Sequence, residues 1–141
     1  MQKRFELVSK SEVLSPLRKE LRQLLGQGGW EKKSTEEILL AIDEALTNII
    51  RHAYGGQPGA MVVLFDDGPE KTEIILEDCG KKFDPTQVPP PELPRHKPGG
   101  LGVHFIRTIM DRVVYDEAFK EGNRLHLIKF KSKKLKGEGA L

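Results

Sequence analysis

The chain has 141 residues, of which 38% are hydrophobic and 31% are charged, and its formal net charge at pH 7 is +2. These values are typical of one soluble globular domain, and they argue against a nucleic-acid partner, which requires a concentrated basic surface. No apolar run approaches the roughly 20 residues of a membrane-spanning helix, so no membrane partner is expected. The single cysteine, Cys79, excludes an internal disulfide and suits the reducing cytoplasm, where we expect the protein to be.

The first predicted elements are a strand and a helix. Residues 4–8 alternate between polar and apolar side chains, as a half-buried strand does. Apolar residues then recur at helical spacing from Val13 to Leu25, behind a cap-like Ser9. Pro16 lies inside this pattern, where it either kinks the helix or marks a later start.

A second helix is predicted to begin at the sequence STEE, residues 34–37. These residues match a capping box in which the side chains of Ser34 and Glu37 bond to each other's backbone. The helix then runs to about Tyr54, where a cluster of glycines and a proline ends it.

The remaining periodic segments predict two hairpins and a third helix. Residues 60–66 and 72–78 flank the turn DGPE and form the first hairpin, and residues 112–120 and 124–130, joined near EGN, form the second. Between the hairpins, residues 101–111 have helical length and directly follow a pair of glycines.

A proline-rich segment separates the first hairpin from the third helix. Six of the nine prolines fall between Pro85 and Pro98, which excludes a regular helix or a central strand there. A connection this long in a compact domain is either functional or disordered. We interpret it as a lid over a binding site.

This order of elements predicts an α+β fold. The order is β-α-α-β-β-lid-α-β-β, which implies a mixed or largely antiparallel sheet with helices layered on one face. We expect one domain over residues 1–133 and a flexible basic tail at residues 134–141.

Two polar residues, Glu44 and Asn48, lie one turn apart along the edge of the second helix's apolar face. A carboxylate and an amide oxygen at this spacing on a rigid element could coordinate Mg²⁺ and position a nucleophile. Taken alone, an inert and solvated boundary pair is the commoner explanation, because polar pairs at this spacing are routine.

Asp78 ends an apolar strand and is followed by Gly80 and the turn residues Phe83, Asp84 and Pro85. An acid at this position can accept a hydrogen bond from the exocyclic amine of a base, and glycine lets a flat ring approach the backbone. An Asx turn followed by a proline turn explains the same residues without a ligand.

Glycines also precede the third helix, at Gly99, Gly100 and Gly102. Backbone N–H groups exposed at a helix N-terminus favour phosphate. The pattern matches neither the Walker motif nor the dinucleotide fingerprint, and a plain loop-to-helix joint is the alternative.

In this order and spacing, DEALTNIIRHAY, DCGKKFDP and KPGGLGVHFIRTIMD resemble the N, G1 and G2 boxes of the GHKL ATPase superfamily. The form E-A-x-T-N followed by HAY is similar to that of the small bacterial anti-sigma-factor serine/threonine kinases of the RsbW and SpoIIAB type. The resemblance covers essentially the whole chain. It implies a two-layer α/β sandwich, the Bergerat fold, with ATP held between the helical layer and a mobile lid.

The resemblance also implies roles for individual residues. Glu44 matches the catalytic acid that activates the acceptor hydroxyl, and Asn48 matches the amide that ligates the Mg²⁺ bridging the ATP phosphates. Asp78 matches the acid that accepts from the adenine amino group, and Gly80 gives the ring room. His52 and Ala53 match residues that support the pocket wall.

At the phosphate end, Gly100 and Gly102 match the G2 glycines, with Leu101 between them. Some family members have an arginine just before these glycines, where it reaches the terminal phosphate. Here Pro98 and Gly99 take that place, which leaves Lys97 as the nearest cation. A lysine lacks the bidentate fork of arginine, so the transfer rate is open to question.

Three hypotheses follow. The first is a kinase that uses ATP and Mg²⁺ to phosphorylate a STAS-type anti-anti-sigma protein and that alternatively holds a sigma factor; homodimer formation is left open. The second is a nucleotide-gated protein that sequesters a sigma factor and phosphorylates little. The third, ranked last because no long phosphoacceptor helix is present, is the catalytic module of a histidine kinase.

Overall fold

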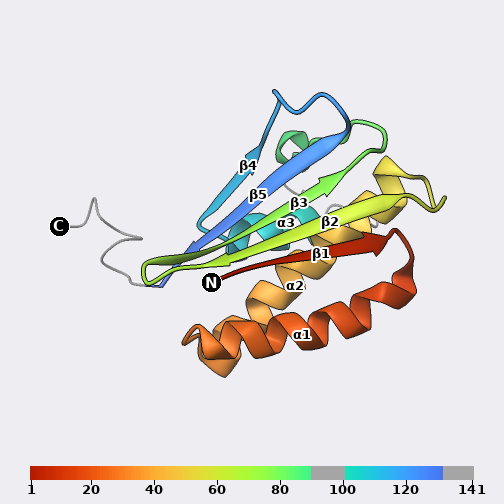
Figure 1. Ribbon diagram of the computed structural model, residues 1–141. Coiled ribbons are helices and arrows are strands. Elements are labelled where there is room, and N and C mark those ends of the chain that lie inside the picture. Colours follow the sequence, from red (N-terminus) through yellow and green to blue (C-terminus); the bar gives the residue numbers. More distant parts are fainter. Residues whose placement is uncertain (90–100, 132–141) are drawn as a thin grey trace.

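The computed structural model describes residues 1–89 and 101–131, with the elements of an α+β fold in two layers (Figure 1). The proposed tail at 134–141 lies outside the described residues. One layer is a five-stranded sheet in the order β1-β2-β3-β5-β4, and each neighbouring pair is antiparallel. Of the two sheet types expected, the antiparallel one is found. The strands are β1 (Gln2–Val8), β2 (Ala60–Asp67), β3 (Lys71–Asp78), β4 (Arg112–Tyr115) and β5 (Asn123–Phe130).

The other layer consists of three α-helices on one face of the sheet. In Figure 1, α2 and α3 pass behind the strands and α1 runs below β1. Shorter helical turns extend this layer at the start of α1, at the end of α2 and after β3. The elements are η1 (Ser11–Val13), α1 (Leu14–Gln27), α2 (Lys32–Asn48), η2 (Ile49–Ala53), η3 (Pro85–Gln87) and α3 (Leu101–Ile109).

The first helix begins later than its cap-like serine suggested. Its α-helical part starts at Leu14, so Pro16 occupies the first turn, where a missing N–H disturbs no helical bond. Ser9 does not cap it. Its Oγ accepts from the Gly59 N–H at 2.8 Å and donates to the Gln57 carbonyl at 3.0 Å, which fastens the end of β1 to the segment before β2.

The predicted capping box at the start of the second helix is wrong. The helix already begins at Lys32, and the Glu31 carbonyl accepts from the Thr35 N–H at 2.9 Å. Ser34 and Glu37 therefore lie inside the helix, where no capping position remains for them. The Ser34 hydroxyl instead lies 3.5 Å from the Glu31 carboxylate.

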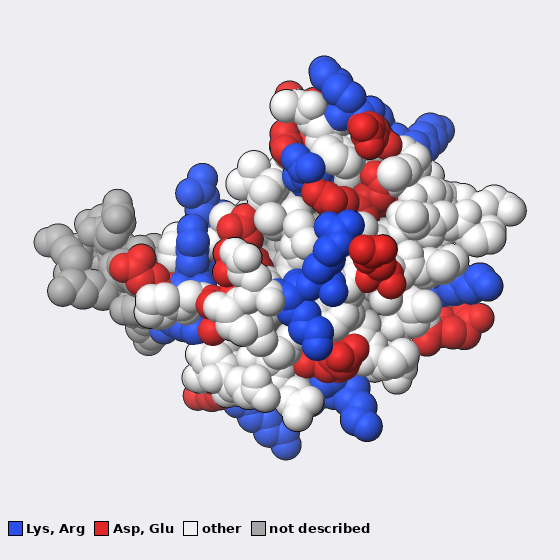
Figure 2. Space-filling view, viewed as in Figure 1, with Lys and Arg blue, Asp and Glu red and all other residues white. Residues whose placement is uncertain are grey.

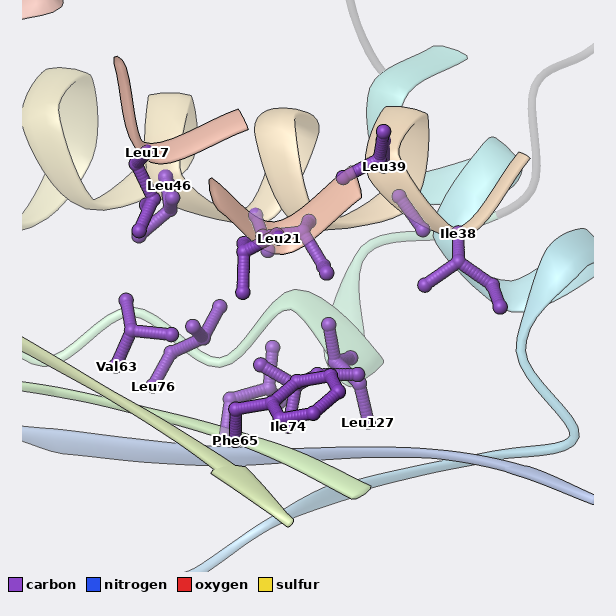
Figure 3. Close-up of a cluster of buried hydrophobic side chains, with 14 of the residues drawn as sticks. Leu17, Leu21, Ile38, Leu39, Leu46, Val63, Phe65, Ile74, Leu76 and Leu127 are labelled. Carbon is purple, nitrogen blue, oxygen red and sulfur yellow. The ribbon is translucent and has the colours of Figure 1, made fainter. Parts of the chain in front are cut away.

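The hydrophobic core fills the space between the layers. Alternate strand positions face inward because Val63 pairs with Leu76, and Phe65 with Ile74, in the β2–β3 register. Figure 3 shows these side chains directed toward leucines and isoleucines of α1 and α2. The buried members include Leu17, Leu21, Ile38, Leu39, Ile42, Leu46, Val63, Phe65, Ile74, Leu76 and Leu127.

The face of the sheet turned away from the helices carries charges of both signs (Figure 2). Arg124 of β5 pairs with Glu77 of β3 at 2.7 Å, and His126 contacts Glu73 at 2.8 Å. Opposite charges on neighbouring strands stabilise the sheet modestly and keep this face hydrated. Within the described parts of the chain, no helix is both long and apolar enough to cross a membrane.

The contribution of the inter-layer core can be measured with a pair of substitutions on α2. Ile38 is 0% exposed and Leu40 is 41% exposed. We expect Ile38→Ala to lower the free energy of unfolding by about 2–5 kcal/mol, because it leaves a cavity. The matched Leu40→Ala should change it by less than about 0.5 kcal/mol. Denaturant unfolding followed by circular dichroism measures both, and equal losses would contradict this assignment of the core.

Candidate active site

A cavity opens between the end of α2 and the ends of β3 and β5. It holds about 340 Å³ of empty space, part of it open to solvent. Its walls are mostly apolar, with side chains such as Ala45, Ile49 and Leu125, and only a few polar groups interrupt them. A largely apolar pocket with few convergent polar groups is the usual form of a site for a planar organic ligand. The polar residues that line it are Asn48, Asp78, Tyr115 and Asn123.

Asp78 is the charged group of this cavity, and only 2% of it is exposed. Its Oδ1 accepts two hydrogen bonds, from the Gly80 N–H at 2.8 Å and from Asn123 Nδ2 at 2.9 Å. Its Oδ2 is buried and has no hydrogen-bond partner among the described residues. Burial raises the pKa of this carboxyl above its ordinary value, although the donors on Oδ1 and the nearby Lys82 oppose the rise.

Asn48 supplies the second unpaired group. Its side-chain Nδ2 is buried and lacks a hydrogen-bond partner within residues 1–89 and 101–131. Buried polar atoms are satisfied in the great majority of cases, so two unpaired atoms on one cavity indicate a missing polar ligand. Rotation of the amide exchanges its nitrogen and oxygen, so Asn48 can offer a ligand either a donor or an acceptor.

Glu44 lies one turn before Asn48 on α2, and α3 approaches its carboxylate closely. A side-chain carbon added to Gly102 would lie 2.3 Å from Glu44 Oε2. Only glycine therefore fits at this point of α3 without displacing the acid. The predicted acid of the second helix therefore lies beside the first turn of the third.

Some of the residues predicted to lie near the phosphates are outside the described part of the chain. Lys97 and Gly100 lie in the segment that the structure does not describe, and for Leu101 only the backbone, at the start of α3, is described. In the described parts of the chain, no group of three or more His, Cys, Asp or Glu side chains could hold a metal ion. Asn48 fits a different kind of site, in which Mg²⁺ takes few protein ligands and is bound mainly by substrate phosphates and water.

Close packing explains why a glycine stands at position 80. A side-chain carbon there would lie 2.5 Å from the Ala53 carbonyl oxygen, which also accepts from the Lys81 N–H at 2.7 Å. The end of β3 thus packs directly on the backbone of η2. Because η2 is a π-helical turn that immediately follows Asn48, this contact fixes the helix end that positions the amide.

His52 and Ala53 support the wall of the cavity. Ala53 lines the cavity directly, and the His52 ring stacks on the ring of Phe83 with their centroids 4.4 Å apart. Partial burial, and secondarily the charge of Arg51, lowers the pKa of His52. The imidazole is therefore neutral at pH 7, which suits an apolar wall.

Sequence reasoning missed Asn123 and Tyr115. Asn123 faces Asp78 in the β3–β5 register, and its Oδ1 accepts from the Phe83 N–H at 2.9 Å and from the Tyr115 hydroxyl. Its Nδ2 also donates to the Lys81 carbonyl at 2.8 Å. No sequence motif marks either residue, and only the strand register brings them to the site.

Arg107 was also not singled out by its sequence context. From α3 its guanidinium donates to the carbonyls of Val88 at 2.8 Å, of Pro85 at 3.1 Å, and of Thr86. Pro85 lines the cavity. This one side chain therefore connects the helix beside Glu44 with the wall on the side of Asp78.

The packing role of Gly80 gives a stability prediction. We expect Gly80→Ala to destabilise the fold by about 1–3 kcal/mol, because neither Ala53 nor its backbone can yield easily. Gly26 in α1 is the matched control, since nothing lies within 4 Å of an added carbon there. Gly26→Ala should stabilise by about 0.5–1 kcal/mol, as alanine is the better helix former. Thermal unfolding of both variants tests the contrast, and a tolerated Gly80→Ala would refute it.

Comparisons with known proteins agree with this geometry. Residues 7–129 match the family of the histidine kinase-like ATPase domain. The chain is 30% identical over 132 residues to serine-protein kinase RsbW of Bacillus cereus (strain AH187), covering 83% of this chain and 82% of the relative. The same values hold for serine-protein kinase RsbW of Bacillus thuringiensis subsp. konkukian (strain 97-27).

A solved structure supports the fold. The crystal structure of the RsbU and RsbW domains of a Mycobacterium tuberculosis protein superposes with a TM-score of 0.65 at 15% identity, covering 92% of this chain. The chain spans 32% of that longer protein. Because the family match and the 30% identical relatives each extend over most of the chain, the protein belongs to the histidine kinase-like ATPase family, in its serine-protein kinase branch.

Proposed function

We propose that this protein is an ATP-dependent serine/threonine kinase and anti-sigma regulatory factor that phosphorylates a small STAS-type anti-anti-sigma protein. The observation that carries the proposal is a pair of buried atoms on one apolar cavity, Asp78 Oδ2 and Asn48 Nδ2, which have no hydrogen-bond partner among the described residues, with Glu44 one turn before Asn48. The kinase names of the relatives support the reaction type.

The base of ATP occupies the apolar part of the cavity in this proposal. Asp78 Oδ2 accepts a hydrogen bond from the exocyclic amine of adenine, which satisfies the Asp78 oxygen that has no partner among the described residues. Because Oδ2 is already removed from water in the free protein, the bond forms without further desolvation of the carboxylate. The stack of His52 on Phe83 keeps the adjoining wall flat.

The phosphates extend from the cavity toward Glu44 and α3. Asn48 would hold the Mg²⁺, which neutralises phosphate charge when bound, and the N–H groups at the start of α3 would face the phosphate oxygens. Gly100, Leu101, Gly102 and Lys97 complete this end in the proposal. Phosphoryl transfer needs alignment and charge neutralisation more than covalent help from the protein.

Glu44 is then the catalytic acid–base residue. It orients the acceptor hydroxyl of the partner and takes up its proton as the oxygen attacks the terminal phosphorus atom, while the bond from that phosphorus to the bridging oxygen breaks and ADP leaves. Its carboxylate already lies beside Gly102 in α3, where the phosphates are proposed to reach. The rigid helix holds Glu44 and Asn48 in fixed relation, so the hydroxyl and the phosphate chain are aligned together.

The circuit around the kinase belongs to the same proposal. The protein works in the cytoplasm as one domain over residues 1–133 with a basic tail at 134–141, and it alternatively holds a sigma factor. A second candidate, a sigma-factor-sequestering protein with little kinase activity, is favoured by Pro98 and Gly99, which stand where some relatives have arginine. Rapid stoichiometric phosphorylation of the partner would exclude this second candidate and support the kinase. The serine-protein kinase names of the relatives argue against a histidine-kinase module.

The role of Glu44 can be tested by one isosteric substitution. We expect Glu44→Gln to lower the rate of partner phosphorylation about 10²- to 10⁴-fold while ATP affinity stays within about twofold, because the acid acts on the hydroxyl and not on the nucleotide. Transfer from labelled ATP to a STAS protein gives the rate. Glu37→Gln is the matched control, two turns earlier on the same helix face. Undiminished transfer by Glu44→Gln would exclude this role.

Asp78→Asn tests the base site and its charge. Opposite an exocyclic amine the new amide presents a donor, and we expect ATP affinity to fall at least about tenfold by calorimetry. The pKa of Asp78 is higher in the folded protein than in the unfolded chain, so the folded state binds the proton more tightly. The free energy of unfolding of the wild type therefore increases as the pH falls through the range between these two pKa values.

The Asn variant should lose that part of the pH dependence of unfolding, since its side chain does not titrate. Asp66→Asn, an exposed position on β2, should retain both the affinity and the wild-type pH dependence. Wild-type affinity in Asp78→Asn would place the base elsewhere.

A further inference from the structure

The polar end of the cavity is organised by Asn123, which is 6% exposed and uses every hydrogen-bonding group of its amide. Its Nδ2 donates to Asp78 Oδ1 and to the Lys81 carbonyl, at 2.9 and 2.8 Å. Its Oδ1 accepts from the Phe83 N–H and from the Tyr115 hydroxyl. The amide is therefore held by partners on two strands and on the segment after β3.

These partners fix the direction of each hydrogen bond. Phe83 N–H can only donate and the Lys81 carbonyl can only accept, so the amide of Asn123 has one possible orientation. In that orientation its oxygen faces the Tyr115 hydroxyl, which must donate its hydrogen to the amide. The Tyr115 oxygen is left with lone pairs only. Burial, followed by the nearby Asp84 and Asp78, raises the pKa of Tyr115, so this hydrogen stays in place at pH 7.

The same orientation determines what Asp78 offers a ligand. Two hydrogen bonds, from the Gly80 N–H and from Asn123 Nδ2, converge on Oδ1, while Oδ2 has no hydrogen-bond partner among the described residues. The raised pKa of Asp78 brings the carboxyl closer to protonation, and the amide hydrogen of Asn123 opposes this by favouring the charged form. With Asn123 in place, this end of the cavity presents acceptors alone, from Asp78 and Tyr115.

We propose that Asn123 is the positioning residue that sets the base specificity of this site, by holding the Asp78–Tyr115 wall in an acceptor-only state that admits a purine with a 6-amino group and rejects a 6-oxo purine. The inference rests on the proposed ATP site. A site built to bond a substrate N–H discriminates strongly against an analogue that lacks it, because its buried acceptor then stays unpaired. A 6-oxo purine places a carbonyl oxygen there, and two acceptors repel.

Asn123→Asp is the sharpest test, because it keeps the shape and reverses one hydrogen bond. A carboxylate oxygen replaces Nδ2 opposite Asp78 Oδ1, where the atoms are now 2.9 Å apart. Two carboxylates this close share a proton, and the pair titrates at a raised apparent pKa. The proton of the pair resides on Asp78 part of the time, and the neutral carboxyl group can then turn an O–H toward the ligand, so the wall no longer presents acceptors alone. If the role of Asn123 were merely structural, this substitution would leave the base preference and its pH dependence unchanged.

The experiment measures dissociation constants of the full chain for ATP and ITP with Mg²⁺, since inosine carries oxygen in place of the adenine 6-amino group. Wild type should prefer ATP by more than about tenfold, with a ratio that is constant between about pH 7 and 8. In Asn123→Asp the ratio should fall at least about fivefold and should fall further as the pH decreases. Gln87→Glu, which adds the same charge at an exposed position of η3, should keep the wild-type ratio.

The outcomes separate this inference from the proposed function. If wild type binds neither nucleotide, the proposed ATP site fails and this inference fails with it. If wild type prefers ATP and Asn123→Asp shows the same pH-independent ratio, the site stands and the role of Asn123 is overturned. If Asn123→Asp does not fold, the same ATP-to-ITP affinity ratio is measured on Tyr115→Phe, which removes one acceptor of the same wall. Its ratio should fall about two- to fivefold, and an unchanged ratio would refute the proposal.

Discussion

One buried carboxylate, Asp78, is the constraint on which the site depends, because the described residues satisfy one of its oxygens and leave the other unpaired. The β3–β5 register places Asp78 opposite Asn123, and two glycines allow the surrounding backbone to close in. A side-chain carbon at Gly122 would lie 2.0 Å from the Asp78 carbonyl oxygen, and one at Gly80 would meet Ala53. A buried carboxylate with one oxygen unpaired is unfavourable in a folded protein, so its presence here indicates a function.

The rest of the site is arranged around this group by rigid elements. The α2 helix carries Glu44 and Asn48 one turn apart, and its π-helical end packs on Gly80 directly after Asp78. Arg107 links α3 to the opposite wall through three carbonyls. The proposed base end and the proposed phosphate end are thereby held in one frame, which is what in-line phosphoryl transfer requires.

Much of this architecture could be predicted from sequence, because burial imposes periodicity on each element. The alternation of strands and the spacing of helices identified both hairpins and all three α-helices. Local capping signals failed: Ser9 found partners near residue 58, and Ser34 lay inside a helix that began earlier. Asn123 and Tyr115 could not be found, because Asn123 reaches Asp78 across 45 positions and only through strand pairing. The roles of Glu44, Asn48 and Asp78 came from resemblance, since each had an ordinary structural explanation.

The most direct test of the central claim is the pKa of the Asp78 carboxyl, measured by carbon-detected NMR in the free and nucleotide-bound protein. In the free protein the pKa should lie above the ordinary aspartate value, because burial disfavours the charge. Saturation with ATP and Mg²⁺ should lower it, because the amine of adenine bonds to the charged form of an oxygen that is already desolvated. A pKa that does not move on ATP binding, or that rises, would contradict the account.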